Sequence, residues 1–126
     1  MEDWEDWEDF AMDSSVVRGH HVYKSIWTPF LEEVLQAETE EGNEEDRYAV
    51  AILKDSGVVV GHVPRSFSRT LYFLRHRGSI ECKITEHRKY GIGLEVPCTY
   101  SLSGKPKYIK RLVKLLTKAD SNKQDQ

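Results

Sequence analysis

The chain of 126 residues lacks the features that mark several large classes of protein. It has no apolar run near the roughly 20 residues that a membrane-spanning helix needs, so we expect no membrane association. Its acidic amino terminus lacks the basic segment followed by an apolar segment of a secretory signal peptide. We therefore expect an intracellular protein, with the nucleus as one option.

Cysteine is scarce, with Cys82 and Cys98 only. In a reducing compartment we expect both to be free thiols packed as small apolar groups, and a disulfide between neighbouring strands is the alternative. The cysteines and histidines do not form the CxxC or HxxxH spacing of a zinc site, and His62 is interpreted as a packed or edge histidine. The motifs GxSxG, HExxH and GxxxxGK are also missing, so we expect no enzyme activity, no metal and no cofactor.

Charge is distributed very unevenly along the chain, although the formal net charge is only -3. Residues 1–59 contain 16 acidic and 4 basic side chains, a net of -12, whereas residues 60–118 contain 3 acidic and 13 basic side chains, a net of +10. The second half alone would attract a polyanion such as nucleic acid.

Residues 1–14 repeat a Glu-Asp-aromatic triplet three times, ending at Trp4, Trp7 and Phe10. Seven acids without a base oppose folding, so the segment is expected to be a disordered tail. The alternative is a docking segment for a protein partner, or for the basic half of this chain, in which aromatic side chains anchor and acids meet a basic rim.

A β-hairpin followed by a helix is predicted within residues 46–78. The apolar runs Tyr48–Leu53 and Val58–Val63 are joined by a short connection that carries Gly57. Pro64 has no N–H for a ladder and ends the second strand. The next helix is expected to have Ser66 as its N-cap and to stop at Gly78.

The whole pattern favours a mainly β fold with one or two helices, a small six-stranded, partly open barrel of OB-like type. Further strands are predicted over 15–23, from Glu33, over 79–88 and over 92–100, although the segment after Leu31 also permits a helix. A loop over 101–106 and a second helix over 108–117 follow. The expected single domain spans 15–118, with disordered tails at 1–14 and 119–126.

The second predicted helix carries the strongest signal for a polyanion. Six bases and no acid lie within fourteen residues, with Tyr108 among them; the bases are Lys105, Lys107, Lys110, Arg111, Lys114 and Lys118. Lys107, Lys110 and Arg111 are the candidate phosphate contacts. The alternative is an ordinary solvated face of a helix that packs through Ile109 and Leu116.

The hairpin motif resembles the HIRAN domain family, in its Asp46-Arg47-x-Ala49-Val50 segment and in Val60-Gly61-His62-Val63-Pro64-Arg65. A Gly19-His20 pair and Trp27-Thr28 extend the likeness over roughly residues 17–100. The resemblance implies a small β-barrel module that binds the 3′ end of single-stranded DNA. In that family two aromatic rings sandwich the terminal base, and an Arg, an Asp and a further basic residue hold the end.

When the family's site is carried over by position, Asp46 is expected to accept the terminal hydroxyl and Arg65 is expected to be the basic residue that holds the end. Ser25, Ile26 and Glu45 occupy the positions of the family's Arg and its two aromatics. An ordinary salt bridge is the alternative for the pair Asp46 and Arg65.

The sequence therefore predicts a non-enzymatic module that binds single-stranded DNA. Arg47 is a further candidate contact, and Trp27 and Tyr48 are the candidate stacking residues. A core plug at one end of the barrel is the alternative for Trp27. The competing function is a protein-interaction module whose DNA pocket has degenerated. The sequence does not indicate an oligomeric state.

Overall fold

The computed structural model describes residues 6–86 and 94–124. The elements along the chain are β1 (Glu8–Val17), α1 (His20–Tyr23), β2 (Val34–Thr39), β3 (Val50–Lys54), η2 (Asp55–Gly57), β4 (Val58–His62), α2 (Arg65–Tyr72), η3 (Arg75–Arg77), β5 (Gly78–Ile84), β6 (Val96–Gly104) and α3 (Pro106–Gln124). No helix in these ranges is long and apolar enough to cross a membrane.

The strands form one antiparallel sheet in the order β1-β6-β5-β2-β3-β4. The sheet curls so that its two edge strands approach each other, and they meet at a single antiparallel bridge between Arg18 and His62. The predicted mainly β, six-stranded, partly open barrel is therefore confirmed. The predicted β3–β4 hairpin is also confirmed, with a tight 3₁₀ turn at Asp55–Gly57.

Side chains of β5 and β6 that are alternately buried and exposed along each strand form the centre of the core. In β5 the side chains of Ile80, Cys82 and Ile84 are buried while their neighbours point outward, as the period of two requires. In β6, Cys98 and Tyr100 are buried in the same way. Both cysteines are free thiols, as predicted. A hydrogen bond with Cys98 and then burial raise the pKa of the Cys82 thiol, which keeps that thiol protonated.

The prediction of a disordered tail over residues 1–14 is wrong for residues 8–14, because β1 begins at Glu8 and pairs with β6 along its length. Phe10 ends the last acidic triplet and Met12 lies two residues beyond it, and both pack against the core. Pairing with β6 also satisfies the backbone of this segment. The first strand consequently ends at Val17, earlier than predicted, and a one-turn helix follows it.

Three boundaries in the second half of the chain also differ from the prediction. Strand β6 continues through the expected loop to Gly104, and α3 begins at Pro106 and extends to Gln124, past residue 118, where the sequence predicts a tail. Helix α2 begins at Arg65, directly after Pro64, so Ser66 lies inside the helix and is not its N-cap. Pro64 is itself the N-cap residue, and its ψ of 138° is still outside the helical range.

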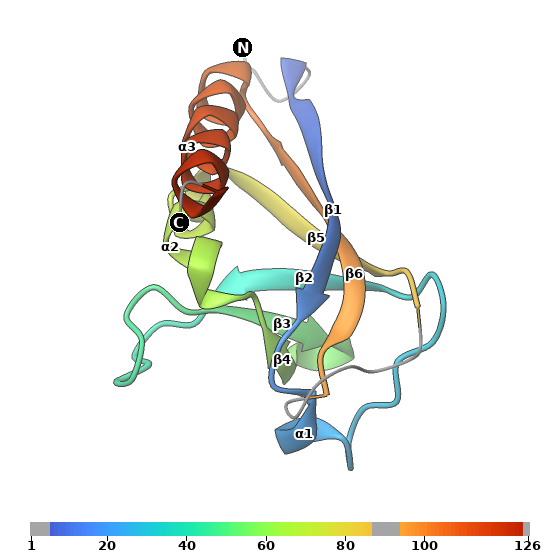
Figure 1. The fold of residues 1–126 in the computed structure, drawn as a ribbon. Coiled ribbons are helices and arrows are strands. Elements are labelled where there is room, and N and C mark those ends of the chain that lie inside the picture. Colours follow the sequence, from blue (N-terminus) through green and yellow to red (C-terminus); the bar gives the residue numbers. More distant parts are fainter. Residues whose placement is uncertain (1–5, 87–93, 125–126) are drawn as a thin grey trace.

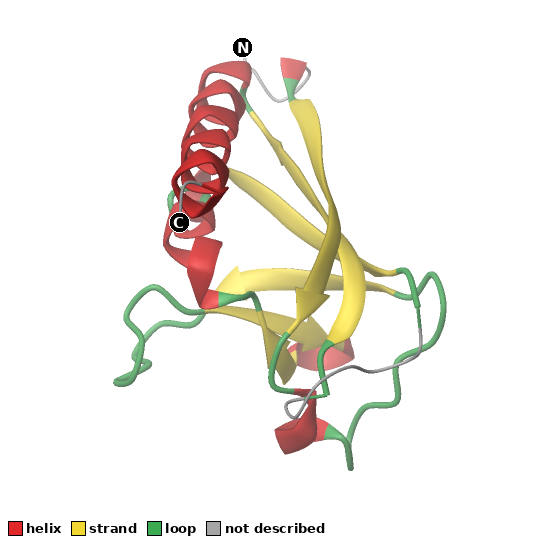
Figure 2. Ribbon diagram, viewed as in Figure 1, coloured by secondary structure: helices red, strands yellow, loops and turns green. Residues whose placement is uncertain are grey.

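Helices α2 and α3 lie together on one side of the sheet, whereas α1 lies at the opposite end of the barrel (Figures 1 and 2). Ile109 and Leu112 of α3 are buried in the core. The rings of Phe73 and Tyr108 meet edge to face with centroids 5.9 Å apart, which connects the end of α2 to the start of α3. Helix α3 is therefore an integral part of the domain.

Candidate nucleic-acid interface

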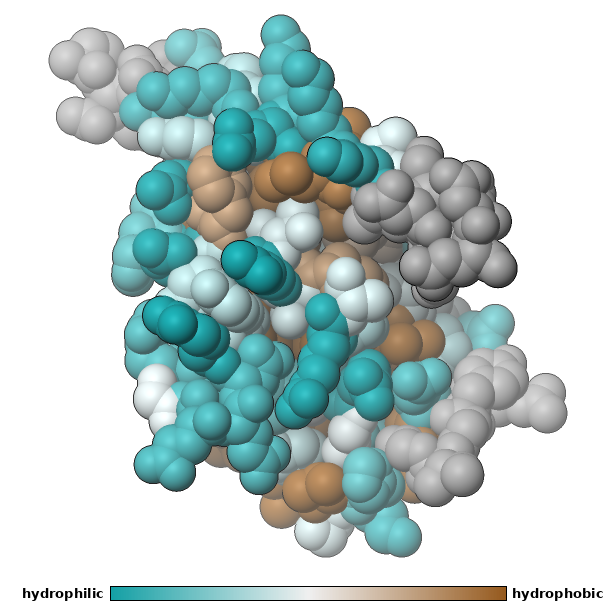
Figure 3. Space-filling model, turned by 60° about the vertical axis from the view of Figure 1, so that its left-hand side comes forward, coloured by the Kyte–Doolittle hydropathy of each residue, from teal (hydrophilic) through white to brown (hydrophobic). Residues whose placement is uncertain are grey.

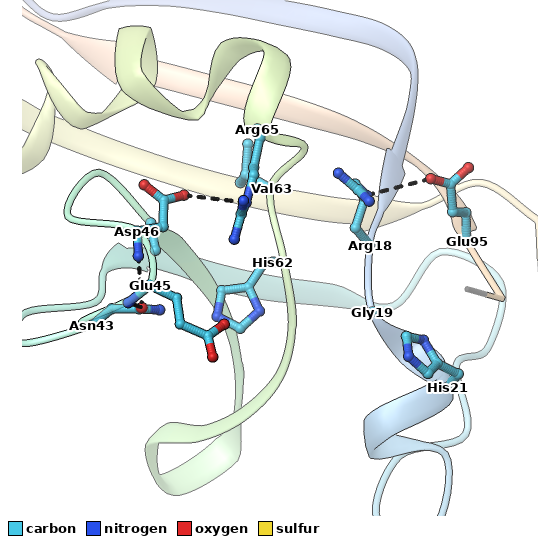
Figure 4. Close-up of a pocket in the computed structure, with 11 residues that line it drawn as sticks. Arg18, Gly19, His21, Asn43, Glu45, Asp46, His62, Val63, Arg65 and Glu95 are labelled. Carbon is cyan, nitrogen blue, oxygen red and sulfur yellow. Dashed lines mark hydrogen bonds and ion pairs between the residues drawn. The ribbon is translucent and has the colours of Figure 1, made fainter. Parts of the chain in front are cut away.

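An open cleft of about 470 Å³ lies where the end of β1 approaches the end of β4. Its lining combines charged, polar and small side chains: Arg18, Gly19, His21, Asn43, Glu45, Asp46, Ala49, His62, Val63, Arg65 and Glu95. Figure 4 shows Arg65 and Asp46 on one side of this cleft and Arg18 and His21 on the other. Four separate parts of the chain, residues 18–21, 43–49 and 62–65 together with Glu95, therefore converge on it.

Asp46 and Arg65 converge from the two ends of the β3–β4 hairpin, and the Arg65 Nε lies 3.8 Å from the Asp46 Oδ2 (Figure 4). The Arg65 side chain is 67% exposed, so this ion pair is largely solvated and contributes little to stability. The other carboxylate oxygen of Asp46 accepts the backbone N–H of Tyr48 at 2.9 Å. Asp46 is thus fixed in position while one of its oxygens remains directed at the cleft.

Hydrogen bonds organise the loop that carries Asp46. The Asn43 Oδ1 accepts the backbone N–H groups of Glu45 and Asp46 at 2.9 and 3.0 Å. The Asn43 Nδ2 donates to Glu40, and the Glu40 Oε1 also lies 2.7 Å from the His62 Nε2. Burial raises the pKa of the Glu40 carboxyl, but the hydrogen bonds from His62 and Asn43 outweigh burial and hold that pKa below its usual value.

The opposite wall of the cleft is held in place by the backbone bridge between Arg18 and His62, where the two edge strands of the sheet meet. The backbone N–H of Arg18 donates to the His62 carbonyl at 2.8 Å, and that of His62 donates to the Arg18 carbonyl at 2.9 Å. Gly61 permits this close approach, because a Cβ there would lie 2.4 Å from Val17 Cγ1 and 3.0 Å from the Arg18 carbonyl oxygen. The Arg18 Nε also lies 3.6 Å from the Glu95 Oε2.

The electrostatics of the cleft are mixed. Arg18 and Arg65 each face one carboxylate, and Glu45 adds a further negative charge. Such an arrangement can accept a hydroxyl hydrogen on a carboxylate and place a guanidinium beside a phosphate, within one small site. It does not supply a strong excess of positive charge.

Comparison with known proteins places the chain in a family. The model of the HIRAN domain matches residues 23–103, more than half of the chain. The chain belongs to the HIRAN domain family. No curated protein matches its sequence.

Solved structures share the HIRAN fold at low sequence identity. The crystal structure of the HIRAN domain of human HLTF gives a TM-score of 0.67 at 18% identity over 88% of each chain. The HLTF HIRAN domain in its DNA-bound conformation gives 0.69 at 17% identity, covering 94% of this chain and 95% of that one. A protein from Lactobacillus plantarum gives 0.60 at 14% identity, covering 78% of this chain and 98% of that one.

The burial of Trp27 contradicts its predicted role as a stacking platform in this HIRAN domain. Its side chain is only 1% exposed, and its indole N–H donates to the Glu33 carboxylate at 3.1 Å. The ring of the buried His20 meets it edge to face, and the His20 Nε2 lies 2.7 Å from the Trp27 carbonyl oxygen. Trp27 is therefore a core plug, which is the alternative that its sequence context permits, because no ring face remains for a base.

Tyr48 and Arg47 lie just outside the HIRAN cleft. Tyr48 is partly buried, and its ring meets that of Tyr72 edge to face with centroids 5.4 Å apart. The Arg47 guanidinium carbon lies 5.4 Å from the Tyr48 ring centroid. Neither residue lines the cleft, although both follow Asp46 directly.

The predicted phosphate contacts of α3 form a second group away from the cleft. Lys107, Lys110 and Arg111 are exposed on α3 and do not line the cleft. The Lys107 Nζ lies 5.1 Å from the Tyr108 ring centroid, and the Arg111 guanidinium carbon lies 5.7 Å from that of Phe73. The predicted site residues are thus divided between the cleft and this helix.

Sequence reasoning missed several polar residues of the HIRAN cleft. These are Arg18, His21, Asn43 and Glu95, and the sequence indicates His62 only as a packed or edge histidine. Glu40 does not line the cleft but lies 2.7 Å from the His62 Nε2. Asn43 follows Gly42, a pair typical of a turn, and that was the available signal. The described part of the chain contains no cluster of His, Cys, Asp or Glu placed to hold a metal.

Proposed function

We propose that this HIRAN domain is a non-enzymatic nucleic-acid-binding module whose cleft receives the 3′ end of single-stranded DNA. The observation that carries the proposal is the convergence of Asp46 and Arg65 on an open cleft of about 470 Å³. The similar fold of the HLTF HIRAN domain in its DNA-bound conformation supports it.

In this proposal each part of the surface has a separate task. The Asp46 carboxylate accepts the terminal hydroxyl, and Arg65 contacts the adjoining phosphate. Arg47, Lys107, Lys110 and Arg111 add salt-dependent attraction to the backbone, because they are exposed bases. Tyr48, next to the cleft, is the residue placed to stack on a base.

Fluorescence anisotropy tests this function with single-stranded oligonucleotides that carry a free or a blocked 3′ end, at two salt concentrations. End selectivity that persists at the higher salt supports the cleft. Equal affinity for free and blocked 3′ ends, with weaker binding at the higher salt, indicates that only a basic surface binds, and the proposed end recognition then fails. An RNA oligonucleotide of the same sequence distinguishes the two kinds of strand.

A protein-interaction module is the second candidate, because large apolar side chains are exposed next to α1. Ile26, at the position of a family aromatic, is 52% exposed and does not line the cleft, and Phe30 is 61% exposed. Glu45 in the cleft repels a phosphate. The acidic-aromatic segment around Trp7 is a further docking element in this alternative. Absence of oligonucleotide binding at low salt would favour it.

A further inference from the structure

Arginine and tyrosine side chains from the loop before β3, from α2 and from η3 contact one another. The Arg69 guanidinium carbon lies 4.9 Å from the Tyr48 ring centroid, on the ring that Arg47 also approaches. The Tyr48 ring contacts the Tyr72 ring, and the Arg75 guanidinium carbon lies 4.6 Å from the Tyr72 ring centroid. We name these five residues, Arg47, Tyr48, Arg69, Tyr72 and Arg75, the basic-aromatic strip.

The strip begins at the edge of the cleft. Tyr48 is hydrogen-bonded through its backbone to Asp46, and Arg69 lies one helical turn, about 6 Å, beyond Arg65. Figure 3 turns the side of α2 and α3 forward, and it shows strongly hydrophilic surface interrupted by paler and by hydrophobic patches. Because Tyr48 is bonded to Asp46 and Arg69 follows Arg65 on α2, a strand that enters the cleft can continue onto the strip.

The positive charge of the strip is not compensated. Residues 65–77 contain four arginines and no acid. Among the described residues, Arg47, Arg69 and Arg75 make no ion pair with a carboxylate, whereas both arginines of the cleft do. Their guanidinium groups rest on tyrosine rings, and such contacts are weak at an exposed site.

We propose that the basic-aromatic strip is a binding track for the single strand that leaves the cleft. On this track Arg69 and Arg75 turn from the rings to phosphates, and bases stack on Tyr48 and Tyr72. The inference rests on the proposed function and extends it from the terminal nucleotide to the nucleotides behind it. A single strand fits because its bases are free to stack, whereas a duplex offers its bases only at its ends.

The length of the oligonucleotide tests the track in the full chain. We compare strands of about 4 and about 12 nucleotides with free 3′ ends, lengths within the range of known single-strand sites. The wild type should bind the longer strand more tightly. Tyr72→Leu should weaken binding of the longer strand by roughly tenfold and leave the shorter one unchanged, while Tyr72→Phe retains the wild-type affinity.

The double variant Arg69→Gln/Arg75→Gln should lower the affinity for the longer strand and reduce the slope of log affinity against log salt by about 2. Lys54→Gln/Lys83→Gln is the matched control, because it removes two exposed bases that belong to neither the cleft nor the strip. Arg69 and Arg75 are exposed, so the double arginine variant is expected to fold even if Tyr72→Leu is unstable. Thermal unfolding checks the stability of each variant.

The outcomes separate the track from the proposed function. Equal wild-type affinities for the two lengths, or equal losses in the arginine variant and its lysine control, overturn the track while end binding stands. Absence of binding by either strand overturns both. An acidic peptide that competes as well as the unlabelled long strand, together with an unaffected Tyr72→Leu, assigns the strip to an acidic protein and also overturns the proposal.

Discussion

Substitution of Asp46 separates its structural role from a role in binding. Asp46→Asn retains an oxygen for the Tyr48 N–H at 2.9 Å and replaces the oxygen near Arg65 with an amide that cannot accept a hydrogen. The lost ion pair is exposed, so Asp46→Asn should lower the unfolding free energy by less than about 1 kcal/mol. Asp46→Ala also removes the turn hydrogen bond, which brings the loss to about 1–2 kcal/mol and lowers Tm by roughly 5 °C.

The binding prediction for these two variants is different. A hydrogen bond to a charged carboxylate is worth about 1.5 kcal/mol or more, so both variants should lose roughly tenfold in preference for a free over a blocked 3′ end. Most of the salt-sensitive affinity should remain, because the bases outside the cleft are unchanged. Anisotropy with both oligonucleotides, together with thermal unfolding, measures each quantity. An undiminished end preference in Asp46→Asn would refute the proposed role of this carboxylate.

Three further predictions concern stability. Leu112→Ala should lower the unfolding free energy by about 2–5 kcal/mol and Leu115→Ala, at a position 36% exposed, by less than about 0.5 kcal/mol in urea titrations, and similar losses would contradict the packing of α3. Trp27→Phe should cost about 1–3 kcal/mol without changing oligonucleotide affinity in anisotropy; a selective loss of affinity would show that Trp27 reaches the ligand. The pKa of Glu40 is lowered in the folded state, so its stabilisation is complete above its usual pKa of 4.5 and is lost as the pH falls through the lower folded pKa. Denaturation from about pH 6 to about pH 3 should therefore show a shallower decline for Glu40→Gln, and an unchanged slope would contradict this role.

Local patterns were sufficient where one segment determines its own structure. Gly57 between two apolar runs predicts the hairpin, and Pro64 predicts the end of its second strand. Local patterns are insufficient for β1. Its many acids hide the alternation of core-facing and outward-facing residues around Phe10, and that alternation produces a strand only when the segment pairs with β6. Pairing between residues about ninety positions apart is a property of the assembled sheet, and a composition-based prediction of disorder has no access to it.

The same distinction applies to the candidate site. Asp46 and Arg65 were identifiable because they flank one hairpin, so their proximity follows from local geometry. The position of Trp27 depends on Glu33 and on the barrel end that it closes, and its residue type alone suits either a buried or an exposed role. Arg18 joins the cleft only through the bridge to His62, which no local motif records.

The absence of a side chain at Gly61 has a mechanical consequence. The contact between the first and last strands of the sheet is made by two main-chain hydrogen bonds, and the space for them exists only without a Cβ. The separation of the two cleft walls is thereby set by hydrogen bonds between main-chain groups, and variation in the polar side chains that line the walls leaves it unaltered. A ligand that spans both walls would hold these two edge strands together, so a bound ligand should raise the resistance of the entire domain to unfolding.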